Sequence, residues 1–131
     1  MTYGDGLCSI NLDDLLQFHE KNEKIATVSA VHPPVRFGEL EIDGDKVVKF
    51  EEKPQASAGW INGGYFVLNS NVFDYIKNDQ TLFEKEPMTK LYQDNNLNAY
   101  KHEGFWKCMD TLRDKIDLEK ILIDKGQIWK K

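Results

Sequence analysis

Residues 50–65 read Phe50-Glu51-Glu52-Lys53-Pro54, then a short polar connection, then Trp60-Ile61-Asn62-Gly63-Gly64-Tyr65. Glu52 offers acceptors, and the compact ammonium of Lys53 suits a phosphate oxygen. Asn62 both donates and accepts, while glycine at position 63 lets backbone amides come close to a ligand. This stretch predicts a corner that binds hydroxyls and phosphate. The alternative is a charged strand end, a loop and the start of a glycine-containing strand.

Length and charge limit the possibilities. The 131 residues, 40% of them hydrophobic, predict one domain over 1–131 with a single core. A net charge of -5 gives no electrostatic basis for binding nucleic acid or an anionic membrane surface. Two cysteines, Cys8 and Cys108, and the lack of a signal-like N-terminus predict a cytoplasmic protein with free thiols.

The N-terminal part predicts half of a βαβ unit. Asn11 is the expected N-cap of a helix that ends near Asn22, and 25–31 is a nearly continuous apolar run typical of a buried strand. A parallel crossover needs a strand before the helix, and Thr2-Tyr3 would supply only its last rung. We therefore expect the chain to begin inside a larger domain.

The middle of the chain predicts an α/β fold with an antiparallel insertion. Residues 38–50 alternate around an Asp43-Gly44 turn signal, which predicts a hairpin whose second strand leads to Glu52 and Lys53. Further on, we expect a strand at 65–68, a short helix capped by Asn69 or Asn71, a capping box from Thr81 to Glu84, and a helix whose first residue is Pro87.

Two aspartates stand where strands are expected to give way to helices. Strands at 97–100 and 105–109 are followed by a helix with Thr111 as N-cap, Asp114 three residues later and Gly126 as its stop. Asp110 lies before this helix, and Asp5 lies in the corresponding place before the first one. Should the two strands be neighbours, Asp5 and Asp110 would suit Mg²⁺, which takes one or two carboxylates plus substrate phosphates. Otherwise both are turn or cap residues.

The histidines carry less functional signal. His19, His32 and His102 lack metal-ligand spacing with one another or with a cysteine, so we expect them to be structural or solvated.

Five blocks in the right order resemble the sugar-1-phosphate nucleotidylyltransferases, and within that family the cytidylyl branch. The match covers nearly the whole chain, as if it were the family's C-terminal half. The blocks are Tyr3-Gly4-Asp5-Gly6, Pro34-Val35-Arg36-Phe37-Gly38-Glu39-Leu40, Phe50-Glu51-Glu52-Lys53-Pro54, Trp60 to Leu68, and Gly104 to Lys115.

The resemblance implies a fold, a reaction and a set of site residues. The fold would be part of a Rossmann-like mixed sheet with a β-hairpin insertion, lacking the N-terminal nucleotide-binding strands. The reaction would transfer CMP from CTP to glucose 1-phosphate, giving CDP-glucose and pyrophosphate, in an enzyme that is a homo-oligomer at full length. Asp5 and Asp110 would bind Mg²⁺, Lys53 would be catalytic through the sugar phosphate, Glu52 would take glucose hydroxyls, and Gly38, Asn62 and Gly63 would line the sugar pocket.

The sequence also departs from the family. The Gly-rich loop with an Arg and a following Lys, which cradles the nucleotide phosphates, is not found in these 131 residues. We therefore expect a piece of the enzyme that is inactive alone. The alternative is a non-catalytic module for sugar-phosphate binding or assembly. Lys107 and Cys108 also stand where close relatives usually have other residues.

Overall fold

The structure is a computed structural model that describes residues 1–34, 39–51 and 59–129. Its elements follow one another as β1 (Gly6–Cys8), α1 (Leu12–Asn22), β2 (Ala26–Val31), β3 (Glu39–Asp43), β4 (Lys46–Glu51), β5 (Ile61–Leu68), the 3-10 helix η1 (Ser70–Tyr75), α2 (Glu86–Gln93), β6 (Leu97–His102), β7 (Trp106–Cys108) and α3 (Leu112–Lys125).

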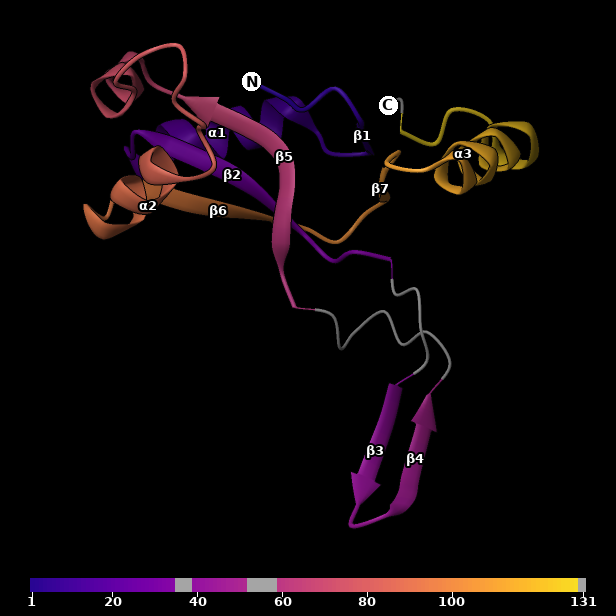
Figure 1. Ribbon diagram of the computed structural model, residues 1–131. Helices are drawn as coiled ribbons and strands as arrows, with labels where there is room; N and C mark the ends of the chain where they lie inside the picture. Colours follow the sequence, from indigo (N-terminus) through magenta and orange to yellow (C-terminus); the bar gives the residue numbers. More distant parts are fainter. Residues whose placement is uncertain (35–38, 52–58, 130–131) are drawn as a thin grey trace.

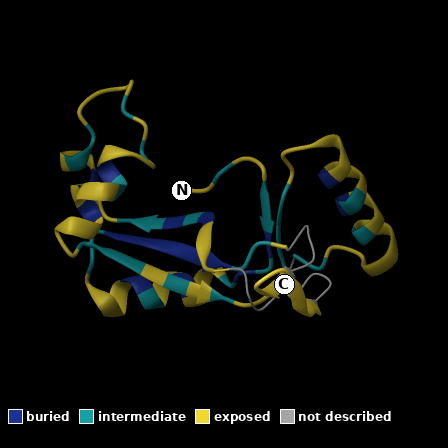
Figure 2. Cartoon of the chain, turned by 60° about the horizontal axis from the view of Figure 1, so that its bottom comes forward, coloured by how far each residue is buried: buried dark blue, intermediate teal, exposed yellow. Residues whose placement is uncertain are grey.

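The core is built around β2, the central strand of a three-stranded sheet ordered β5-β2-β6. Every residue of β2 is buried, as its apolar, β-branched sequence predicts, and Figure 2 shows it as the dark strand in the middle of the sheet. The strand pairs antiparallel with β5 and parallel with β6, so the sheet is mixed. This confirms the predicted α/β fold class with a mixed sheet.

Helix α1 begins at its predicted cap and is tied to the sheet by a buried histidine. The Asn11 side chain accepts from the backbone N–H groups of Asp13 and Asp14. The His19 ring lies 2.9 Å from the Thr27 hydroxyl on one side and 3.1 Å from Asn69 Oδ1 on the other. Such a satisfied buried ring confirms that His19 is structural.

A short antiparallel ribbon, β1 with β7, corrects the expected arrangement near Asp5. Gly6 pairs with Cys108 and Cys8 with Trp106, while Thr2 forms an isolated antiparallel bridge to Tyr65. Asp5 therefore precedes a strand instead of joining a strand to α1. The expectation that Thr2-Tyr3 ends a parallel strand was wrong, because the residues before Asp5 pair antiparallel with β5 and the parallel partner of β2 is β6.

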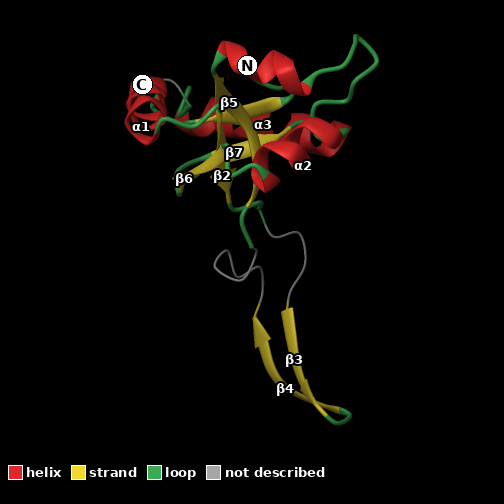
Figure 3. Ribbon diagram, turned by 90° about the vertical axis from the view of Figure 1, so that its left-hand side faces the viewer, coloured by secondary structure: helices red, strands yellow, loops and turns green. Residues whose placement is uncertain are grey.

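The predicted hairpin forms as β3 and β4, with Asp43 paired to Lys46 around Gly44 at a φ of 59°. Figures 1 and 3 draw this hairpin projecting away from the three-stranded sheet. Residues 40–50 are all exposed, among them the side chains Leu40, Ile42, Val47, Val48 and Phe50.

The segment between β5 and β6 has one predicted N-cap in its predicted place and departs from two other predictions. Asn69 occupies the N-cap position of η1 without a side-chain cap bond, because its side chain instead bonds His19 and the Lys24 carbonyl. Thr81 and Glu84 cap no helix. Helix α2 begins at Glu86, with Lys85 at its N-cap position. Pro87 is therefore the second residue of the helix and not, as expected, the first.

The last helix forms as its capping signal predicts. Thr111 and Asp114 make a reciprocal capping box at its start, and Gly126 follows its end. Among the described residues, no helix is long and apolar enough to cross a membrane.

Candidate functional site

The β1–β7 ribbon brings together the neighbourhoods of the two predicted metal-binding aspartates. The Met109 backbone N–H donates to the Asp5 carbonyl at 2.8 Å, continuing the ladder one step beyond the Gly6–Cys108 pair. Asp110 is the next residue along the chain, and both aspartates are exposed. Asp5 and Asp110 can share a metal site only if their strands are neighbours. The pairing of β1 with β7 meets this condition.

Asp110 also lies directly before the N-terminus of α3. The helix is started by Thr111, whose hydroxyl donates to Asp114 Oδ2 at 2.7 Å and accepts from the Asp114 backbone N–H at 3.2 Å. The unpaired N–H groups of a first helical turn favour an ionised carboxylate nearby. Asp110 therefore stands at the positive end of the α3 dipole.

Cys108 touches the same carboxylate. Its thiol donates to Asp110 Oδ2 at 3.1 Å. Burial first, and then the hydrogen bond and charge of Asp110, raise the pKa of Cys108 to about 11. The thiol therefore stays protonated and serves Asp110 as a hydrogen-bond donor.

Asn62 and Gly63, the predicted sugar-pocket residues in the described chain, are engaged with the protein itself. Asn62 Nδ2 donates to the Tyr3 hydroxyl at 2.9 Å, and Asn62 Oδ1 accepts from the Gly64 N–H at 2.8 Å. The backbone bulges here, since Ser29 alone opposes residues 63–65 between the Ala30–Asn62 and Val28–Phe66 pairs. A ligand that bound the Asn62 side chain would therefore share the Asn62 amide group with the Tyr3 hydroxyl.

The two glycines are required by packing. A Cβ on Gly63 would stand 2.7 Å from Ser29 Oγ and 2.8 Å from Val31 Cγ1, while one on Gly64 would stand 2.7 Å from the Tyr3 ring at a φ of 79°. The sequence motif thus has a structural cause independent of any ligand.

Two aromatic side chains join β5 to the β1–β7 ribbon, and neither was predicted to be a site residue. The Trp106 indole N–H donates to the Gly63 carbonyl at 2.9 Å, and the Tyr65 hydroxyl donates to the Gly6 carbonyl at 2.9 Å. These bonds place Gly63 beside the ribbon that carries Asp5 and Asp110. An aromatic residue with a polar end in each of the strands β5 and β7 was the available signal.

A second missed cluster lies at the start of β5. The ring centroids of Trp60 and His32 are 3.9 Å apart, and Lys101 Nζ lies 5.4 Å from the Trp60 ring. Pairing of Ala30 with both Asn62 and Lys101 puts Asn62 and Lys101 on one face of the sheet, and Trp60 is two residues before Asn62. An aromatic ring and a cation thus lie on the same face of the sheet as Asn62.

The remaining predicted site residues, Gly38, Glu52 and Lys53, lie outside the described residues. Their roles in the sugar pocket and in catalysis stay predictions.

The two aspartates are the candidate metal ligands that the described residues offer at the ribbon. Within 1–34, 39–51 and 59–129, no group of three or more His, Cys, Asp and Glu side chains is placed to hold a metal. Mg²⁺ keeps most of its waters and takes one or two carboxylates plus substrate phosphates. Asp5 and Asp110, both exposed, are the residues that would supply those carboxylates.

Residues 1–123 match the nucleotidyl transferase family, and the chain belongs to it. The chain is 48% identical over 130 residues to the glucose-1-phosphate cytidylyltransferase of Salmonella typhi, and equally to that of Salmonella typhimurium (strain LT2). In both cases the alignment covers 98% of this chain and 50% of the relative. The chain thus spans about half the length of these relatives.

A solved structure supports the fold. A Bacillus anthracis crystal structure, described as a candidate glucose-1-phosphate thymidylyltransferase in complex with a sucrose, aligns with 96% of this chain and 55% of its own. The TM-score is 0.61 at 20% sequence identity. The mixed sheet with its hairpin is therefore a partial nucleotidyltransferase fold.

Proposed function

We propose that this chain is the sugar-phosphate half of a glucose-1-phosphate cytidylyltransferase. The observation that carries the proposal is the ribbon that sets Asp5 beside Met109-Asp110 while Trp106 holds Gly63 against it. The 48% identity to glucose-1-phosphate cytidylyltransferases along almost the whole chain supports glucose 1-phosphate and CTP as the substrates.

In the proposed reaction, a phosphate oxygen of glucose 1-phosphate attacks the α-phosphorus of CTP, and the bond from that phosphorus to pyrophosphate breaks. Such a transfer depends on alignment and charge neutralisation more than on covalent help from the protein. Mg²⁺ held by Asp5 and Asp110 would neutralise phosphate charge. The chain's own part is to hold the sugar phosphate through Lys53 and Glu52, with Gly38, Asn62 and Gly63 around the sugar.

The chain alone is expected to bind the sugar phosphate without completing the reaction, since the nucleotide-binding loop of the family is not among its 131 residues. The coverage of half of each relative keeps a second candidate open, a non-catalytic module that binds sugar phosphate or assembles with another chain.

The test is a titration of the purified chain with glucose 1-phosphate, with and without Mg²⁺, followed by amide chemical shifts. We expect saturable shifts at Asn62 and Gly63 that disappear in Lys53→Ala and persist in the matched control Lys46→Ala, which lies on the exposed hairpin. Mg²⁺ alone should shift the amides of Asp5 and Asp110, and Asp110→Asn should remove that response. Equal shifts with inorganic phosphate, or no loss in Lys53→Ala, would contradict the sugar-phosphate site.

A further inference from the structure

The Asn62 side chain is held by the protein on both sides of its amide. Its Oδ1 accepts from the Gly64 N–H at 2.8 Å, and its Nδ2 donates to the Tyr3 hydroxyl at 2.9 Å. A backbone N–H can only donate, so the amide oxygen must face Gly64 and the NH2 group must face Tyr3. The orientation of the Asn62 amide is therefore set by these two partners.

The two bonds leave hydrogen-bonding capacity on the oriented amide. An NH2 group carries two protons and a carbonyl oxygen two lone pairs, and the bonds to Tyr3 and Gly64 use one of each. Asn62 is exposed, so a ligand can reach its second proton and its second lone pair. A hydroxyl group both donates and accepts, and it can therefore use both.

Tyr3 is anchored well enough to hold the amide in place. Its backbone N–H donates to the Gly64 carbonyl at 3.0 Å, and its ring lies so close to Gly64 that a Cβ there would stand 2.7 Å from Tyr3 Cδ2. The ring centroids of Tyr3 and Phe66 are 5.6 Å apart, and those of Phe66 and Phe83 are 5.7 Å apart. This row of three packed rings fixes where the Tyr3 hydroxyl stands.

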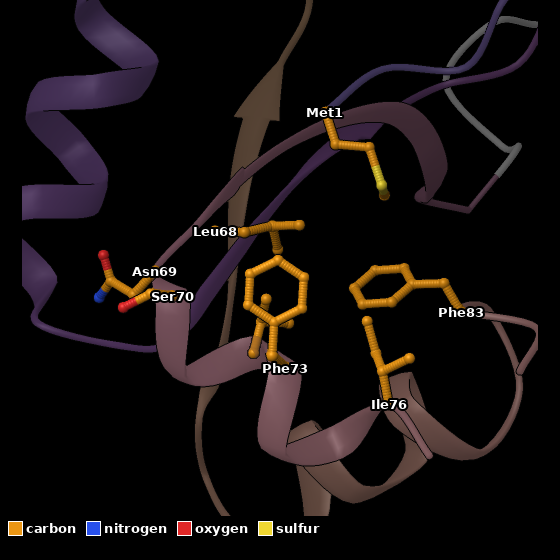
Figure 4. Close-up of a pocket in the computed structure, with 8 residues that line it drawn as sticks. Met1, Leu68, Asn69, Ser70, Phe73, Ile76 and Phe83 are labelled. Carbon is orange, nitrogen blue, oxygen red and sulfur yellow. The ribbon is translucent and has the colours of Figure 1, made fainter. Parts of the chain in front are cut away.

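The row of rings has an apolar end and a polar end. Phe83 lines an apolar hollow of about 310 Å³, where Figure 4 shows its ring beside Ile76. At the other end, the Tyr3 hydroxyl accepts from Asn62, and Glu84 is its second hydrogen-bond partner. Because the Asn62 NH2 group can only donate, the proton of the Tyr3 hydroxyl is left for Glu84.

We propose that Tyr3 is a positioning residue, whose hydroxyl orients the Asn62 amide so that Asn62 receives a sugar hydroxyl through one N–H and one oxygen lone pair. That the ligand is a sugar phosphate rests on the proposed function, whereas the orientation of Asn62 is observed without a ligand. Tyr3 lies two residues before Asp5. One short segment thus carries a candidate metal ligand and the support of the predicted sugar pocket.

The experiment titrates the purified chain with glucose 1-phosphate and, separately, with inorganic phosphate, followed by amide chemical shifts. Tyr3→Phe removes the hydroxyl and keeps the ring. We expect it to weaken the binding of glucose 1-phosphate by about tenfold and to leave that of inorganic phosphate within about twofold, whereas a general loss of packing would weaken both. Tyr92→Phe, at a 61% exposed position on α2, is the matched control and should change neither.

A double-mutant cycle tests whether Tyr3 acts through Asn62. Asn62→Ala should itself weaken the binding of glucose 1-phosphate, and the addition of Tyr3→Phe to Asn62→Ala should then weaken it by less than about twofold more. A further tenfold loss in the double variant would mean that Tyr3 contacts the sugar directly, and it would overturn the proposal. So would an unchanged affinity in Tyr3→Phe.

The ligand-free chain gives a readout that does not depend on the proposed function. The side-chain amide signal of Asn62 should move in Tyr3→Phe and stay in place in Tyr92→Phe, because only the first variant loses the hydrogen-bond partner of Nδ2. If this signal moves while the parent chain binds no glucose 1-phosphate, the proposed function is contradicted and the orienting role of Tyr3 is supported. A signal that stays in place in Tyr3→Phe overturns the proposal even where the parent binds the sugar phosphate.

Discussion

Gly63 leaves no room for a side chain, because Ser29 Oγ and Val31 Cγ1 would lie 2.7 and 2.8 Å from an added Cβ. Both neighbours belong to the buried strand β2, so they have little freedom to move aside. We expect Gly63→Ala to lower the free energy of unfolding by about 1–3 kcal/mol in urea denaturation.

The matched control for that prediction is Gly4→Ala, where an added Cβ meets nothing within 4 Å. Its free energy of unfolding should stay within about 0.5 kcal/mol of the parent. Equal stability of the two variants would show that Ser29 and Val31 give way. The packing account of the glycine motif would then fail.

The Cys108 thiol predicts a pH dependence. Its pKa is raised from 9.0 to about 11, so the protonated thiol is favoured in the folded chain. The resulting stabilisation is complete below pH 9 and is lost as pH rises toward 11, since the unfolded chain ionises first. Near pH 8, alkylation of Cys108 by iodoacetamide should be slower in the folded chain than in urea by up to about a hundredfold, followed by peptide mass spectrometry.

Asp110→Asn should accelerate that alkylation, because it removes the hydrogen-bonding carboxylate and its charge while leaving the burial in place. Asp124→Asn, in an exposed part of α3, is the control and should not change the rate. An unchanged rate in Asp110→Asn would mean that Asp110 does not raise the Cys108 pKa.

At the scale of elements, the start of α3 fixes where Asp110 stands. Thr111 closes the first turn with Asp114, which is only 7% exposed. We expect Thr111→Ala to lower the free energy of unfolding by about 1 kcal/mol and to speed amide hydrogen exchange in the first turn of α3.

Thr111→Ser keeps the hydroxyl and should restore most of the lost stability. The capping box would be unimportant if the serine and alanine variants unfolded at the same urea concentration.

At the scale of the whole molecule, the core and the hairpin should respond differently to truncation. Leu91 is fully buried against Ala26 and Val72, whereas Phe50 on β4 is 61% exposed. Leu91→Ala should cost about 2–5 kcal/mol of unfolding free energy in urea denaturation. Phe50→Ala should change it by less than about 1 kcal/mol, and a larger effect would mean that the hairpin is part of the cooperative core.

Periodicity and capping signals predicted most of the elements, because they depend on contacts within a few residues. The N-caps Asn11 and Thr111, the Gly44 turn and the buried strand β2 were all visible in the sequence. The pairing of the strands was not visible in the sequence, since it depends on contacts between residues that are far apart in the chain. The antiparallel β1–β7 ribbon therefore replaced the expected crossover.

The candidate site was predictable only in part. Asp5 and Asp110 were named from their positions, and the ribbon that brings their backbones together had to be observed. The roles of Trp106 and Tyr65 were not predicted, because hydrogen bonds from a side chain to a distant carbonyl have no local signature in the sequence. Gly38, Glu52 and Lys53 remain predictions from the sequence.

The turn at Gly44 has a practical use. Its glycine has open space around it, its strands are exposed, and the elements of the core lie elsewhere. Exposed turns of this kind tolerate inserted sequence. An epitope or a fluorescent label placed there would report on the chain from outside its core, while the ribbon carrying Asp5 and Asp110 kept its native sequence.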